Sequence, residues 1–487
     1  MHTFLSQHTK FTAKPIKICV LTAISTLVLL VGCTTTNPAP KQIARQSAIT
    51  LNKEPAYNAQ VISTNNTLTE YTLDNGLKVV LKQDKRAPLV MTQIWYNVGS
   101  SDEKIGKGGL AHFLEHMMFK DAKGLTADDY HRLIAHFGGS KNAFTSYDYT
   151  AYYEMLPANQ YPVALQIEAN RMDNLILRPE EVATEKQVIQ EERRQRIDSN
   201  PMAQAFEEFN AIALPNSPKG LSVIGSMAEI ENLDFDDLSH WYDVWYSPNN
   251  ATLVMVGDFD VATAKEWIDK YFGKLPTKTL PARPNLRQSS HRGYNLQTRN
   301  IDGVQVPSLI MAFNVPSLTT ATGNEAYALS LMNDVLDGGL SARFEQSLVR
   351  EQNLLSSVSA RYDIYSKGDG LFIITATPHS GVSLETAEQA IIKEIDHAIN
   401  GTILDSELQR AQTNLTASLV FSNDSIANQA QILGMLNSIG LDSSTLDRLP
   451  NELAKVSVPA IQSTAKHYLT KDNLTVMYVY PKDNKGN

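Results

Sequence analysis

The chain has almost no cysteine. Of its 487 residues only two are cysteines, Cys19 and Cys33, and both lie close to the N-terminus. If residues 1–32 are removed as a signal, one cysteine remains at the new N-terminus, and no disulfide can form within the mature chain. Any metal ion would then be held by histidine and carboxylate side chains alone.

The chain also lacks an excess of positive charge. Its formal net charge is −9, and it becomes −12 once Lys10, Lys14 and Lys17 are lost with the first 32 residues, which contain no acid. Such a charge argues against nucleic acid as a partner and favours simple solubility. It does not distinguish between classes of peptide substrate.

The apolar run near the N-terminus is short. Residues 18–32 are too few to span a bilayer comfortably as a permanent helix. They follow a basic segment and end in Leu-Val-Gly-Cys, which resembles a lipoprotein cleavage box with Cys33 as the lipidated residue. An uncleaved anchor or an ordinary signal peptide is the alternative. Thr34 after the cysteine favours the periplasmic face of the outer membrane of a Gram-negative bacterium. Residues 33–65 are expected to form a tether that reaches roughly 30 Å.

The stretch 108–119 carries two histidines on a predicted helix. Five apolar residues fall on two adjoining helical rows and indicate a buried helix: Leu110, Phe113, Leu114, Met117 and Met118. His112 and His116 project from one face, one turn apart, with Glu115 on the same side. This H-x-x-E-H order is the inverted form of a metalloprotease motif, in which the carboxylate can take a proton from water. The alternative is a pair of core histidines beside a chance glutamate, and composition alone gives such a match about 1 % of the time.

A third metal ligand is expected in the stretch 179–196. Pro179 followed by two acids predicts a helix start, and the arginines near the end suit the negative pole of the helix dipole. Glu185 and Glu192 are seven residues apart and share a face, whereas Glu191 is turned about 100° away. Alone, such a segment is more often a solvated, charged helix. Beside the histidine helix, the metal-ligand interpretation is favoured.

These segments together resemble the pitrilysin/insulinase family of zinc peptidases, in particular its short members related to mitochondrial processing peptidase. The family's Gly-Gly-x-x-Asn-Ala-x-Thr segment is present at residues 138–145, and the resemblance covers nearly the whole chain after about residue 65. It implies that His112, His116 and Glu192 hold one Zn²⁺ per chain. It also implies that Glu185 supports the site and that Glu115 is the general base.

Residues 143–156 alternate and are rich in aromatic residues, which predicts a strand. Extended peptides commonly bind by adding a strand to an exposed sheet edge. The resemblance makes this the substrate-binding edge, with Asn142 and Ala143 nearest the scissile bond. An ordinary edge strand is the alternative. His131 and His136 are five residues apart on a predicted helix, do not share a face, and are interpreted as structural or surface residues.

The second half of the chain resembles a diverged repeat of the first. The pattern of an aromatic-ended helix, a polar turn and a strand occurs at residues 245–256 and again at residues 467–478. The counterpart of the histidine helix, residues 325–336, contains no histidine. Arg350 matches a family arginine that contacts substrate, but the tyrosine expected seven residues later is Ser357. The resemblance therefore leaves open whether the second half can complete an active site.

The fold class expected is α+β, with two similar α/β sandwich halves that form a half-clam around a peptide chamber. The domain organisation expected is a signal (1–32), a tether (33–65), a zinc-binding catalytic domain (66–276), a linker (277–299) and a non-metal domain of similar fold (300–487). About 420 residues are too many for one core.

The sequence thus predicts a zinc metalloendopeptidase that hydrolyses peptides or unfolded segments in the periplasm and is held to the membrane by an N-terminal lipid. A dimer is expected, preferably a heterodimer with a related subunit. The alternative function is a non-catalytic interaction subunit of a membrane-bound, peptidase-like complex. The four intact residues His112, Glu115, His116 and Glu192 argue against that alternative.

Overall fold

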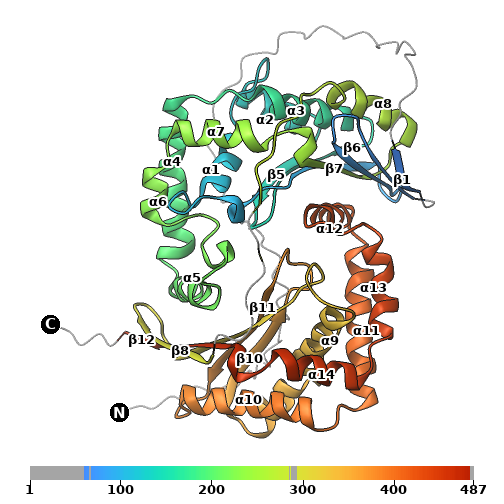
Figure 1. The fold of residues 1–487 in the computed structure, drawn as a ribbon. Coiled ribbons are helices and arrows are strands. Elements are labelled where there is room, and N and C mark those ends of the chain that lie inside the picture. Colours follow the sequence, from blue (N-terminus) through green and yellow to red (C-terminus); the bar gives the residue numbers. More distant parts are fainter. Residues whose placement is uncertain (1–59, 65–66, 284–285, 287–292, 483–487) are drawn as a thin grey trace, which may run out of the picture. The chain divides into compact units, whose positions relative to one another are not determined.

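The computed structural model describes residues 60–64, 67–283, 286 and 293–482. The predicted signal, Cys33 and most of the predicted tether lie outside these residues. Among the described residues, no helix is long and apolar enough to cross a membrane. The described chain contains two mixed β-sheets with helices packed against them (Figure 1), which confirms the predicted α+β class and its two similar halves.

The first sheet has seven strands in the order β1-β2-β3-β7-β4-β6-β5. Only β3 and β7 pair in parallel. The strands are β1 (Gln60–Thr64), β2 (Leu68–Thr72), β3 (Lys78–Gln83), β4 (Leu89–Tyr96), β5 (Ser140–Thr145), β6 (Thr150–Pro157) and β7 (Ala251–Gly257). A tight turn at Asn75-Gly76 joins β2 to β3, and Gly76 adopts the positive φ that such a turn requires.

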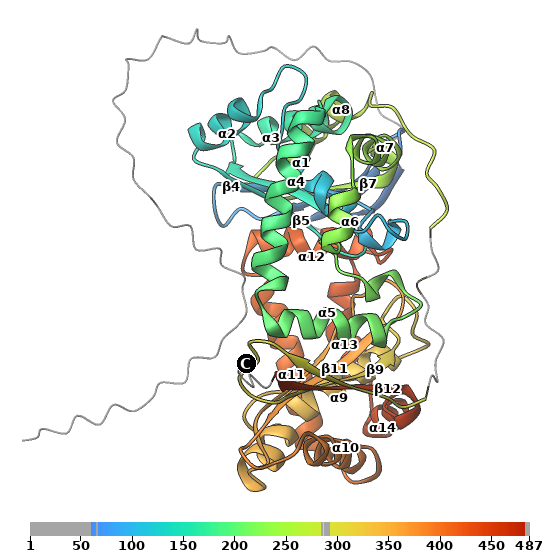
Figure 2. The same cartoon turned by 90° about the vertical axis from the view of Figure 1, so that its left-hand side faces the viewer.

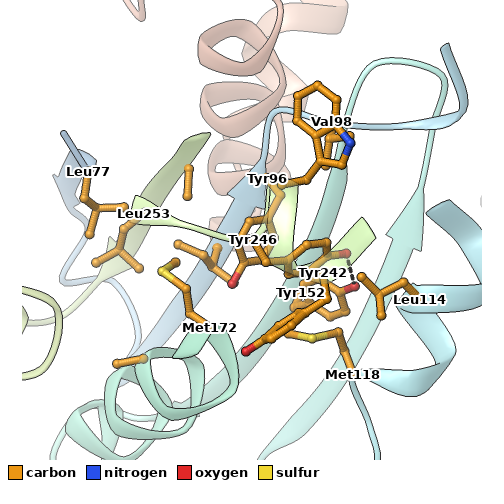
Figure 3. Packing of buried hydrophobic residues seen from close by; sticks show 14 of the residues in the cluster. Leu77, Tyr96, Val98, Leu114, Met118, Tyr152, Met172, Tyr242, Tyr246 and Leu253 are labelled. Carbon is orange, nitrogen blue, oxygen red and sulfur yellow. Dashed lines mark hydrogen bonds between the residues drawn. The ribbon is translucent and has the colours of Figure 1, made fainter. Parts of the chain in front are cut away.

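The helices of the first half other than α5 pack on one face of this sheet. They are α1 (Leu110–Met117), α2 (Ala127–His136), α3 (Tyr161–Asn174), α4 (Pro179–Arg193), α6 (Met227–Asn232), α7 (Phe235–Trp245) and α8 (Val261–Phe272), whereas α5 (Pro201–Ala213) lies against the second sheet. Tyr96, Tyr152 and Tyr246 pack together with Leu114 of α1 and with Met118 in the core of this half (Figure 3). The hydroxyls of Tyr152 and Tyr246 are 2.8 Å apart, so both buried polar groups are satisfied.

The second sheet has five strands in the order β10-β11-β9-β12-β8. They are β8 (Asn295–Ile301), β9 (Ser308–Val315), β10 (Leu355–Tyr362), β11 (Gly370–Pro378) and β12 (Leu474–Pro481). The helices of this half are α9 (Glu325–Asp337), η5 (Phe344–Glu351), α10 (Leu384–Asn400), α11 (Asp405–Ser422), α12 (Ile426–Ser438), α13 (Thr445–Ala454) and α14 (Val458–Tyr468). The predicted repeat is present, because α7 leads through a short turn into β7 as α14 leads into β12.

Each sheet also receives a helix from the other half of the chain. Helix α12 packs on the face of the first sheet opposite to the sheet's own helices, where Leu433 contacts the cluster that contains Trp95. Gly434 permits this approach, since a Cβ atom there would lie 2.1 Å from the indole of Trp95. Helix α5 correspondingly packs through Phe209 against the second sheet. The halves are therefore similar folds that exchange one helix each.

The structure corrects the single strand predicted over residues 143–156. That stretch forms a hairpin of β5 and β6 with a turn at residues 146–149, closed by a hydrogen bond from the Ser146 amide to the Tyr149 carbonyl (2.8 Å). A four-residue turn leaves the period-two alternation in phase, so the pattern alone cannot reveal it. The edge strand is β5, and it is shorter than predicted.

Two segments predicted to lack secondary structure contain strands. Strand β1 lies inside the predicted tether, and β8 begins at Asn295, inside the predicted linker. Both are the outermost strands of their sheets, and β8 alternates half-buried with exposed residues and is largely polar. Polar edge strands give little hydrophobic signal, which explains why the composition suggested unstructured chain.

Candidate metal centre

The histidine helix α1 is fixed at both ends. Its N-cap, Gly109, has φ 87°, and a Cβ atom there would lie 2.4 Å from the Ile224 carbonyl oxygen. The Glu103 carboxylate accepts hydrogen bonds from the amides of Gly109 (3.1 Å) and Ala111 (2.8 Å), and an acid suits this end of a helix. At the other end, Arg171 donates to the Met118 carbonyl (3.0 Å). The helix is thus held in position before any ligand binds.

The three predicted zinc ligands meet in space. The Nε2 atoms of His112 and His116 lie 3.6 Å and 3.3 Å from Oε2 of Glu192. The ligand atoms of these three residues all lie within 4.8 Å of one another. Helices α1 and α4, which carry them, pack side by side (Figure 2). The spacing of seven residues between Glu185 and Glu192 therefore places both acids toward α1, as predicted.

The donor set fits a divalent zinc ion. Burial and the neighbouring His116 lower the pKa of His112 to about 4, so its ring is neutral and available as a ligand. Among the described residues, the buried Oε2 atom of Glu192 has no hydrogen-bond donor, although two imidazole nitrogens face it. Burial disfavours the charged ring of His116, but Glu185 and Glu192 outweigh this effect and raise its pKa to about 9. The pocket therefore favours positive charge between the rings.

Glu185 holds His116 in a defined orientation. Its Oε1 atom lies 2.9 Å from Nδ1 of His116, and its Oε2 atom lies 2.5 Å from Nζ of Lys120. The hydrogen bond with His116, assisted by Lys120, lowers the pKa of Glu185 to about 2 despite partial burial. An ionised carboxylate on Nδ1 leaves Nε2 of His116 directed at the metal position. Arg196, which the sequence did not single out, contacts the other oxygen of Glu192 (2.8 Å).

Glu115 points toward the predicted substrate edge. Its Oε2 atom accepts a hydrogen bond of 2.6 Å from the Thr145 hydroxyl of β5. Burial raises the pKa of Glu115, although this hydrogen bond partly opposes the shift. A raised pKa suits a group that must accept and later release a proton near neutral pH. Thr145 is the last residue of the Gly-Gly-x-x-Asn-Ala-x-Thr segment (residues 138–145), but the sequence alone predicts no role for it.

The predicted substrate-binding residues lie in different halves of the chain. Asn142 and Ala143 lie on β5, the outermost strand of the first sheet. The Asn142 side-chain oxygen accepts a hydrogen bond from the Ala143 amide (2.9 Å).

Arg350 lies in η5 and pairs with Glu345 (3.0 Å), while Ser357 is exposed on the edge strand β10. The first tyrosine after Ser357 in the sequence is Tyr362. Its hydroxyl donates a hydrogen bond to the Pro316 carbonyl (2.6 Å) and is therefore already engaged. His131 and His136 are exposed on α2, as predicted.

Comparisons with known proteins point to one family. A model described as insulinase (peptidase family M16) matches residues 78–227, and one described as peptidase M16 inactive domain matches residues 232–415. The zinc protease PqqE of Helicobacter pylori is 26% identical over 414 residues, which cover 84% of this chain and 92% of that protein. The mitochondrial-processing peptidase subunit beta of Lentinula edodes is 25% identical over 407 residues, which cover 82% of this chain and 86% of that protein.

Solved structures agree in fold. The crystal structure of a protease from Helicobacter pylori matches with a TM-score of 0.78 and 26% identity, over 85% of this chain and 99% of that chain. The first half of the periplasmic protease PqqL from Escherichia coli matches with a TM-score of 0.73 and 20% identity, over 86% of this chain and 93% of that chain. The latter likeness bears on the fold alone.

Proposed function

Because this chain belongs to the insulinase family (M16) of zinc metalloproteases and carries its zinc site, we propose that it is an endopeptidase that hydrolyses peptides or unfolded polypeptide segments. The observation that carries this proposal is the convergence of His112, His116 and Glu192 within 4.8 Å, with Glu115 beside them and next to an open sheet edge. The metal-binding residues thus lie close to the residue proposed as the base and to the sheet edge proposed to bind peptide.

In the proposed mechanism, His112, His116 and Glu192 hold the zinc ion and Glu185 orients His116. Bound zinc supplies Lewis acidity, which polarises the peptide carbonyl and makes water more acidic. Glu115 takes a proton from the attacking water and delivers it to the nitrogen of the leaving amine. The hydroxyl of Thr145 keeps the Glu115 carboxylate pointed toward β5 during both transfers.

The substrate is proposed to add to β5 as a further strand. Backbone groups along an open edge bind an extended peptide with little regard to its sequence. Asn142 and Ala143 lie at the middle of β5, three and two residues before Thr145, and are therefore proposed to flank the scissile bond. To pair with substrate at Ala143, the peptide must displace the Asn142 side chain from the Ala143 amide.

The test is to measure zinc content and cleavage of an unstructured peptide with the purified protein. We expect about one zinc ion per chain, peptide-bond hydrolysis at internal positions, loss of activity after a chelator removes the metal, and recovery when zinc is returned. A zinc-loaded, folded protein that cleaves no unstructured peptide would favour the alternative, a non-catalytic interaction subunit.

A partner subunit is proposed on the basis of Ser357. A tyrosine hydroxyl aimed at the developing oxyanion is worth roughly 10²-fold in rate, and serine is too short to replace it from the same backbone position. We therefore propose a dimer, preferably with a related subunit that carries an arginine–tyrosine pair. Ser357→Tyr should raise the activity of the isolated chain by up to about 10²-fold if the chain self-associates. An already fully active homodimer that Ser357→Tyr leaves unchanged would overturn the partner proposal.

We further propose that Cys33 carries the lipid and holds the enzyme at the periplasmic face of the outer membrane. The signal-like run that ends in Leu-Val-Gly-Cys, with Thr34 after the cysteine, supports this assignment. Acyl chains bind membranes at about 0.8 kcal/mol per buried methylene, so Cys33→Ser should move the protein from the membrane fraction to the soluble fraction. Retention of this variant in the membranes after a high-salt wash would contradict the assignment.

A further inference from the structure

The edge strand β5 carries one ionisable side chain, that of Lys141. Because side chains alternate along a strand, Lys141, Ala143 and Thr145 share one face of the sheet. Thr145 contacts Glu115 of α1 and Ala143 packs against the core that contains α1, so this face is the one that the histidine helix covers. Residues two apart on a strand are separated by about 7 Å. Lys141 therefore lies within about two substrate residues of the position proposed for the scissile bond.

The ammonium of Lys141 is held by aromatic rings. Its Nζ atom lies 4.3 Å from the ring centre of Phe119 and 4.2 Å from that of Tyr130. Both distances are typical of cation–π contacts, which orient a cation without neutralising it. Within the described part of the chain, Lys141 forms no ion pair with a carboxylate. Burial and the nearby Arg171 lower its pKa to about 8, so the side chain is still charged at neutral pH.

The charged residues next to Lys141 do not fully neutralise the positive charge of its ammonium group. Its cross-strand partner is the fully buried Glu154, which accepts a hydrogen bond from the Tyr130 hydroxyl (2.7 Å). Burial and the neighbouring Glu168 raise the pKa of Glu154 well above its usual range, which favours its neutral form. Arg171 pairs closely with Glu168. Arg171 is thus the cation that pairs with the two buried acids, whereas the ammonium of Lys141 contacts aromatic rings instead and is available to an acidic side chain placed beside it.

We propose that Lys141 is a specificity-determining residue that favours substrates with an aspartate or glutamate close to the scissile bond. The inference rests on the proposed function, because it requires a peptide strand along β5. Whether the substrate peptide pairs with β5 in the parallel or the antiparallel direction, every second side chain of the peptide points to the face that the histidine helix covers. These side chains lie beside Lys141. An opposite-charge pair across neighbouring strands favours binding by about fivefold over an uncharged pair.

The test compares matched peptides with the purified, zinc-loaded protein. Aspartate, asparagine or lysine is placed in turn at each of the three positions on either side of a fixed cleavage point. At one of these positions we expect the aspartate peptide to have a kcat/KM roughly fivefold above that of the asparagine peptide, mainly through KM. This ratio should decrease toward one as salt is added, since salt screens a partly exposed pair.

Three variants of Lys141, with one control at another lysine, separate a charge effect from a packing effect. Lys141→Met should bring the aspartate-to-asparagine ratio close to one, Lys141→Arg should retain the preference, and Lys141→Glu should favour the lysine peptide. Lys265→Met is the matched control, because Lys265 also lies over an aromatic ring, that of Tyr71 at 4.8 Å, but on α8 and away from β5. This control should leave every ratio unchanged.

The outcomes distinguish the subsite from the proposed function. Failure of the zinc-loaded wild-type protein to cleave any of the peptides would refute the endopeptidase proposal itself. Cleavage without an acidic preference would refute the subsite alone. A uniform loss of kcat/KM for all peptides in Lys141→Met, with a lower melting temperature, would show that Lys141 only supports the packing of Phe119 and Tyr130.

Discussion

Replacing Glu115 by glutamine is expected to lower kcat by roughly 10²–10⁴-fold while the zinc content stays near one ion per chain. Glutamine keeps the size of the side chain and can still accept the hydrogen bond from Thr145. It cannot take a proton from water, however, and it does not belong to the three residues whose atoms converge on the metal position. The loss should therefore appear in the chemical step and not in metal binding.

The measurement combines metal analysis with steady-state cleavage of an unstructured peptide. KM should change little, since the Glu115 side chain acts on water and does not hold the substrate. The melting temperature should remain close to that of the wild-type protein, because the buried contact with Thr145 survives. Full activity of a pure, zinc-loaded Glu115→Gln protein would refute the assignment of this residue as the base.

Replacing Glu192 by glutamine should abolish both zinc binding and activity. A catalytic zinc site usually has three protein ligands, and the neutral amide removes the one anionic ligand of this set. The remaining pair, His112 and His116, should lose the ion on dialysis. The amide also cannot neutralise the guanidinium of Arg196, which lies 2.8 Å from the Glu192 carboxylate, and this uncompensated charge further disfavours a cation there.

The chain offers a matched control one residue away. Glu191 lies on the same helix with 56% of its side chain exposed, and it pairs with Arg194 instead of facing α1. Glu191→Gln makes the same chemical change and should leave zinc content and kcat unaffected. If Glu192→Gln retained a full equivalent of zinc after dialysis, the third ligand would have to be another residue.

The metal centre was predictable because it depends on local spacing. His112 and His116 share a face by helical geometry, and so do Glu185 and Glu192. The meeting of the two helices came from a family resemblance, since nothing in either segment specifies its partner. Thr145 and Arg196 were missed as partners of Glu115 and Glu192 for the same reason: threonine and arginine are common on surfaces and show their role only after the helices have packed.

The less predictable features depend on contacts between distant segments. The period-two pattern of residues 143–156 could not show that Ser146 to Tyr149 turn the chain back on itself. The polar strands β1 and β8 are stabilised by pairing with β2 and β12, and their own residues carry little strand signal. The packing of Gly434 against Trp95 joins positions more than three hundred residues apart, and no local pattern indicates it.

The exchange of helices α5 and α12 has a consequence for the order of synthesis. In chain order the last strand of the first sheet, β7, ends at Gly257, but α12, which covers the face opposite to the sheet's own helices, ends only at Ser438. Because the chain emerges N-terminus first, whether from a ribosome or from a membrane translocon, about 180 further residues must follow β7 before α12 can form. Throughout that interval the face around Val80, Trp95 and Val254 has no cover. A chain that stops before α12, or a first half made alone, would keep that surface exposed and depend on a chaperone or on the missing half supplied separately.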